Sequence, residues 1–142
     1  MLKLLVPVDG SESSDRGVDH LIKAAQWYRD PVEVHLLTVH HHIPYGRAAS
    51  AVAGDTIQQY YQEEGLAALK SARARLDAAQ IPYTFHIGVG EPAEIIARYA
   101  REKGCDQIIM GTRGLGSVGG LLLGSVATKV LHLASVPVLF VK

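Results

Sequence analysis

Residues 107–126 have the sequence QIIMGTRGLGSVGGLLLGSV, and the fold prediction starts from the change of pattern within this stretch. Residues 107–110 form a short, largely apolar run that is typical of a strand buried in a parallel sheet. Five glycines then fall between positions 111 and 120, and Gly124 precedes a run with helical spacing. A buried strand, a glycine-rich loop and a helix together form one unit of an α/β sheet.

The same alternation of strands and helices continues along the rest of the chain. Strands are predicted over residues 2–8, 32–39, 83–89, 107–110 and 136–141, and helices are predicted between them. Residues 40–55 and 111–123 are expected to be loops. Such alternation predicts a single open, doubly wound, five-stranded parallel sheet with helices on both faces. We expect residues 1–142 to form one domain.

The longest helix is predicted over residues 56–79, since Pro82 cannot continue it. Its apolar residues follow helical spacing and mark the face expected to be buried. These residues are Ile57, Tyr61, Ala68, Ala72, Leu76 and Ala79.

The composition indicates a globular protein and gives no sign of a nucleic-acid or membrane partner. Of the 142 residues, 48% are apolar and 20% are charged, and the formal net charge is zero. The single cysteine, Cys105, allows no internal disulfide, so we expect a reducing, cytoplasmic location. No Asp or Glu follows Asp106, so an anion would be tolerated near the C-terminal end. The alternative is that a buried apolar segment has little room for carboxylates.

The glycine-rich loop is the segment that points to ligand chemistry. Ligands of open parallel sheets bind beyond the carboxyl ends of the strands, and this loop follows such an end. Glycine permits positive φ and lets backbone amides approach a ligand closely. The loop ends at a helix N-terminus, which favours an anion, and Ser125 and Arg113 could add donors. The alternative is a surface loop that needs glycine for its shape alone.

Two familiar phosphate-binding motifs do not apply to this loop. The stretch from Gly114 to Gly119 matches G-x-G-x-x-G, but it follows the fourth strand and no acid lies downstream. The dinucleotide-binding motif follows the first strand and needs that acid. A Walker A loop needs Gly-Lys-Ser/Thr, and no lysine stands between Gly124 and Ser125.

The spacing Gly111-x2-Gly114-x9-Gly124-Ser125 resembles the G-2x-G-9x-G-(S/T) motif of the ATP-binding branch of the universal stress proteins. The resemblance extends over nearly the whole chain. The opening run VPVDGS at residues 6–11 resembles the family's first strand and turn, GVGEP at 88–92 resembles the turn after its third strand, and SVPV at 135–138 resembles its last strand.

The resemblance implies that an adenine nucleotide, ATP or AMP, with Mg²⁺ accompanying ATP, lies across the carboxyl edge of the sheet. It also implies which positions of this chain surround each part of the nucleotide. These are Asp9 near the base and ribose; Pro7, Val8 and Val39 along the adenine; Met110 and Gly111 under the ribose; and Gly114, Gly124, Ser125 and Val126 around the phosphates. A phosphate contact of Arg113 is inferred from its charge alone.

Other side chains were weighed as sites of chemistry. Adjacent residues of an extended chain point to opposite faces, so His40, His41 and His42 are not expected to share a metal, and no native metal site is predicted. His41 or His42 is expected to line the nucleotide pocket instead. Asp9 could alternatively cap the turn that begins at Gly10. Cys105 is expected to be a packing residue.

No catalytic residue is predicted. ATP hydrolysis usually needs Mg²⁺ and carboxylates near the phosphates, and the C-terminal segment supplies none. We therefore expect a stress-response nucleotide-binding protein that acts as a signalling or protective module through an unknown protein partner. The alternative is a slow ATPase or a nucleotidyl-transfer enzyme on the same fold.

The final strand predicts a homodimer. Residues 136–141 are apolar on both faces, and strand order 3-2-1-4-5 leaves them at a sheet edge. An exposed apolar edge promotes aggregation unless it is paired or covered. A two-fold partner would pair it, and the family resemblance implies dimers as well. The alternative is a monomer whose own loop or chain end covers the edge.

Overall fold

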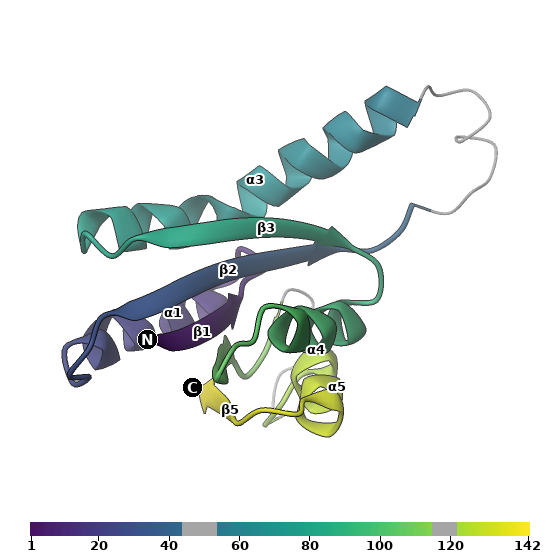
Figure 1. Ribbon diagram of the computed structural model, residues 1–142. Coiled ribbons are helices and arrows are strands. Elements are labelled where there is room, and N and C mark those ends of the chain that lie inside the picture. The colour runs from purple at the N-terminus through teal and green to yellow at the C-terminus, as the bar shows by residue number, and fades with distance from the viewer. Residues whose placement is uncertain (44–53, 115–121) are drawn as a thin grey trace.

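The computed structural model describes residues 1–43, 54–114 and 122–142. Five parallel strands form one sheet in the order β3-β2-β1-β4-β5 (Figure 1), which confirms the predicted fold class. The predicted strand positions are confirmed to within two residues. The strands are β1 (Leu2–Pro7), β2 (Val32–His40), β3 (Tyr83–Val89), β4 (Gln107–Gly111) and β5 (Val138–Val141).

The helices cover both faces of the sheet. Helices α1 (Glu12–Ala25) and α3 (Gly54–Ala78) lie on one face, and α4 (Pro92–Glu102) and α5 (Ser125–Leu133) lie on the other. In Figure 1, α3 extends well past the ends of the strands on which its C-terminal half packs. No helix in the described ranges combines the length and apolar character needed to cross a membrane.

Strand β1 lies at the centre of the sheet because residues 4–6 carry apolar side chains toward both faces. Leu4 and Val6 join the core under α1 and α3, whereas Leu5 joins the core under α4 and α5. All three side chains are at most 1% exposed. Burying a side chain of this kind contributes about 1.5–3 kcal/mol, so the central position follows directly from the apolar run.

Helix α3 buries half of the predicted face fully, and Ile57 and Ala68 are only partly buried. Tyr61, Ala72 and Leu76 are buried as expected, and Leu69, which the predicted face omits, is fully buried. Ala79 was predicted to face inward, but it is exposed. The helix ends at Ala78, and Gln80 has φ of +58°. Ala79 therefore lies in the turn after the helix and does not continue its buried face.

Candidate functional site

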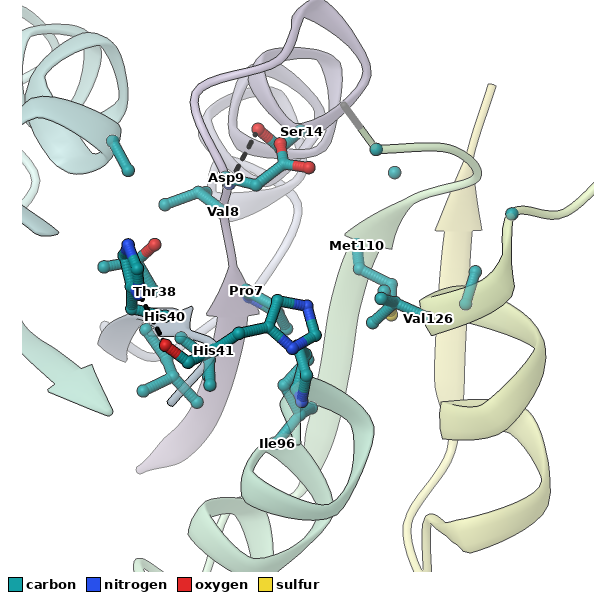
Figure 2. Close-up of a pocket in the computed structure, with 18 of the residues that line it drawn as sticks. Pro7, Val8, Asp9, Ser14, Thr38, His40, His41, Ile96, Met110 and Val126 are labelled. Atoms are coloured by element: carbon teal, nitrogen blue, oxygen red, sulfur yellow. Dashed lines mark hydrogen bonds between the residues drawn. The ribbon is translucent and has the colours of Figure 1, made fainter. Parts of the chain in front are cut away.

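A pocket of about 450 Å³ opens at the carboxyl ends of β1, β2 and β4 (Figure 2). Every residue predicted for the nucleotide site lines it, although these residues come from distant parts of the chain. They are Pro7, Val8, Asp9, Val39, Met110, Gly111, Arg113, Gly114, Gly124, Ser125 and Val126. Pockets that hold small molecules usually enclose about 300–1,000 Å³, so the volume suits a ligand the size of a nucleotide.

The turn after β1 fixes Asp9 at the edge of this pocket. Its Oδ1 accepts a hydrogen bond from the Ser11 backbone N–H at 3.0 Å, and Gly10 within the turn has φ of +85°. The Asp9 N–H in turn donates to Ser14 Oγ at 3.4 Å. Asp9 therefore caps its own turn, as the structural alternative predicted, and also lines the pocket.

The opposite end of the pocket is built from the two described ends of the glycine-rich segment. The Gly124 N–H donates to the Thr112 carbonyl at 2.7 Å, which holds these two ends together. Helix α5 begins at the next residue, and its first turn leaves the N–H groups of residues 125–127 without helical acceptors. These residues line the pocket together with Arg113, so this end is suited to an anion.

Gly111 and Gly114 serve close packing rather than unusual backbone angles, whereas a Cβ on Gly124 would make only ordinary contacts, the nearest at 3.4 Å from Arg113 Cα. Positive φ was expected to be one of their uses, yet Gly111, Gly114 and Gly124 are not among the described residues with positive φ. A Cβ on Gly111 would overlap the Ser13 carbonyl, and one on Gly114 would lie 2.5 Å from Asp9 Oδ2. The glycines at 116, 119 and 120 lie outside the described residues.

Helices α3 and α4 supply lining residues that the sequence analysis did not include. Glu64, Gly65 and Ala68 come from α3, and Pro92 and Ile96 come from α4. Thr38, His40 and His41 continue the wall along the end of β2. Glu64, Gly65, Ala68 and Ile96 belong to none of the quoted motifs, so only the packing of each helix on the sheet could have revealed them, whereas Pro92 closes the GVGEP turn. The presence of His41 in the wall agrees with the expectation that His41 or His42 lines the pocket.

A second polar cluster lies outside the pocket, where β2 and β3 pair beneath α4. Glu33 Oε2 is 2.8 Å from His35 Nε2, and His35 Nδ1 is 3.0 Å from His86 Nε2. The hydrogen bond with His35 lowers the pKa of Glu33, and burial is the main reason why the pKa of His86 is lowered. Within the described ranges, no group of three or more His, Cys, Asp or Glu side chains could hold a metal ion.

The family follows from a match along the entire chain. Residues 1–142 match the model of the universal stress protein family. The chain belongs to the universal stress protein family. As a universal stress protein it has both curated and structural relatives. The universal stress protein YxiE of Bacillus subtilis is 33% identical over 156 residues, which cover 99% of this chain and 98% of that protein.

Solved structures of other proteins share the fold of this universal stress protein. A hypothetical protein of Methanocaldococcus jannaschii superposes with a TM-score of 0.82 and 29% identity, covering 99% of this chain and 95% of that chain. A universal stress protein in complex with cAMP superposes with a TM-score of 0.70 and 27% identity, covering 99% and 97% of the two chains.

Proposed function

We propose that this universal stress protein binds an adenine nucleotide, ATP or AMP, in the pocket at the carboxyl edge of the sheet. The observation that carries the proposal is the convergence of all the motif residues on one pocket of about 450 Å³. A structural relative at 27% identity was solved in complex with cAMP, which is also an adenine nucleotide. The proposal is further supported by the different chemistry of the two ends of the pocket.

One end of the pocket suits a base and the other suits phosphate. Pro7, Val8 and Val39 form an apolar wall near β2, whereas Arg113 and the first turn of α5 lie beyond β4. In the sheet order β2-β1-β4, two strand spacings separate these ends, which is roughly 10 Å. A ribose separates the base and phosphate of a nucleotide by about such a span, so the nucleotide would cross the end of β1 beside Asp9.

The carboxylates at the pocket do not by themselves form a metal site. Asp9 lies at the end of β1 with its Oδ2 beside Gly114, and Glu64 lies on α3, whereas Arg113 and the first turn of α5 bring no carboxylate. Mg²⁺ would therefore be held chiefly by the phosphates of bound ATP. We expect binding rather than hydrolysis, because Asp9 is engaged in capping its own turn and hydrolysis needs groups that position water and stabilise charge at the γ-phosphate.

In this proposal nucleotide occupancy is the signal. The protein would act as a cytoplasmic signalling or protective module whose contact with a protein partner depends on whether ATP or AMP is bound. A homodimer paired through β5 would carry two such pockets. Strand β5 is an edge strand within the described sheet, as this arrangement requires.

Thermal unfolding with a panel of nucleotides tests the proposal. At a free ligand concentration 100-fold above Kd, binding to the folded state adds about 2.7 kcal/mol to stability. We expect ATP or AMP to raise the melting temperature, and GTP at the same concentration to raise it less. The absence of a shift with millimolar ATP and AMP would refute adenine-nucleotide binding. Phosphate release with and without Mg²⁺ distinguishes a binding protein from an ATPase.

A further inference from the structure

The short segment that follows β2 is held in place at both ends. The His40 carbonyl accepts a hydrogen bond from the Gly90 N–H at 2.9 Å, and the Ile43 N–H donates to the Tyr61 hydroxyl at 2.9 Å. The His40 ring makes edge contacts with Tyr60 and Tyr61, at centroid distances of 5.5 and 5.3 Å. Residues 40–43 are therefore tied both to α3 and to the turn after β3.

This arrangement gives His40 and His41 different surroundings. Successive side chains of an extended chain point to opposite faces. His40 turns to the tyrosines of α3, and its Nδ1–H donates to the His41 carbonyl at 2.7 Å. The His41 side chain instead projects into the pocket that Pro7 and Ile96 also line (Figure 2).

His41 has no evident structural role. Its side chain is exposed, and its ring makes no hydrogen bond and no ring contact with the part of the chain that the structure describes. The neighbouring His42 is also exposed, but it does not line the pocket. A polar ring held at a pocket wall without a packing function is available to a ligand.

We propose that the imidazole ring of His41 packs against the nucleobase and is a determinant of affinity for the base. This inference rests on the proposed nucleotide binding and adds a residue to that site. His41 lies two residues after Val39, on the β2 side of the pocket, together with the apolar base wall. Arg113 and the first turn of α5 lie beyond β4, across β1 from this ring. The geometry therefore assigns His41 to the base and not to the phosphate.

Ligands with and without a base provide the test. Isothermal titration calorimetry would compare AMP with ribose 5-phosphate on the wild-type protein and on the His41→Ala, His41→Phe and His42→Ala variants. When alanine replaces an aromatic residue that stacks on a base, the affinity for the ligand falls by about tenfold. We expect His41→Ala to lose about that much affinity for AMP and none for ribose 5-phosphate. His41→Phe keeps a flat ring and should stay within about threefold of the wild type.

The controls separate this inference from the proposed function. His42→Ala, one residue away and outside the pocket wall, should bind both ligands as the wild type does. A wild-type protein that binds neither AMP nor ATP overturns the proposed function and this inference together. Two results would overturn only the role of His41 if the wild-type protein binds AMP. Either His41→Ala binds AMP as tightly as the wild type does, or its affinity for ribose 5-phosphate falls by the same factor as its affinity for AMP. A His41→Phe variant as weak as His41→Ala overturns packing by the ring.

Discussion

Replacing His86 by phenylalanine should destabilise the fold at neutral pH, because it breaks a chain of three polar side chains under α4. Glu33 accepts a hydrogen bond from His35 Nε2, so the lone pair of His35 lies on Nδ1. That nitrogen must then accept a hydrogen bond from His86 Nε2, 3.0 Å away. Phenylalanine keeps a ring beside Tyr99, whose centroid lies 5.4 Å from that of His86, but it removes the donor.

The expected loss of stability in His86→Phe follows from the burial of His35, whose Nδ1 loses its hydrogen-bond donor. His35 is only 9% exposed, so its Nδ1 would have little access to water in the variant. Leaving a buried acceptor unsatisfied costs about 1–3 kcal/mol. For a chain of this size the melting temperature should fall by roughly 3–10 °C.

The stability that His86 contributes should decrease as the pH falls. Burial is the largest cause that lowers the pKa of His86 in the folded state below its ordinary value. The unfolded chain therefore binds more protons than the folded chain as the pH falls below about 6.5. The stability that neutral His86 contributes is present above that pH and is lost as the pH falls through the lower folded-state pKa. The difference in stability between the wild type and His86→Phe should therefore narrow on acidification.

Urea unfolding followed by far-UV circular dichroism at pH 7.5 and pH 5.5 measures both effects. The same exchange at exposed His132 is the matched control and should change stability by no more than about 0.5 kcal/mol. Equal stability of His86→Phe and wild type at pH 7.5 would refute the hydrogen-bonded chain. A difference that widens at pH 5.5 would refute the assigned direction of the pKa shift.

Three further predictions concern the core, the glycine-rich segment and the sheet edge. Leu69→Ala leaves a cavity at a fully buried position and should lower the free energy of unfolding, measured with a chemical denaturant, by about 2–5 kcal/mol. The control Leu122→Ala changes an exposed residue and should lower it by less than about 1 kcal/mol. Gly124→Val should abolish stabilisation by ATP while the far-UV spectrum stays mixed α/β. The backbone there has φ of −74°, which any residue adopts, and a Cβ would make ordinary contacts with Arg113 and Thr112, so the fold should tolerate the change, whereas the branched side chain would crowd the proposed phosphate site. A variant that is stabilised by ATP as the wild type is would show that Gly124 does not contact the phosphates. Sedimentation at micromolar concentration should give a dimer paired through β5, and a single species near 15.3 kDa would exclude it.

The sheet could be predicted because the chain alternates clearly between strands buried on both faces and amphipathic helices. In β1 the leucines at positions 4 and 5 point to opposite cores, so the apolar run over residues 4–8 placed this strand inside the sheet. The family resemblance likewise identified residues more than 100 positions apart that line one pocket, including Asp9 and Gly124.

The contributions of α3 and α4 could not be predicted in the same way. Whether Glu64 or Ile96 reaches the pocket depends on how far each helix extends past the strand ends, and local sequence does not encode that placement. The roles of the glycines depend equally on the fold. Gly111 is required by the Ser13 carbonyl of α1, a neighbour that its own segment cannot reveal.

The hydrogen bond from the Arg113 N–H to Ser13 Oγ, at 3.1 Å, joins groups 100 positions apart, and this separation bears on biosynthesis. The ribosome makes the chain from the N-terminus, so the turn after β1 exists long before the segment that completes the pocket. A nascent chain that ends before β4 can pair β2 with both β1 and β3, yet it has neither the α5 amides nor Arg113. The proposed nucleotide therefore cannot assist the early stages of folding. It would stabilise only a chain whose synthesis is nearly complete.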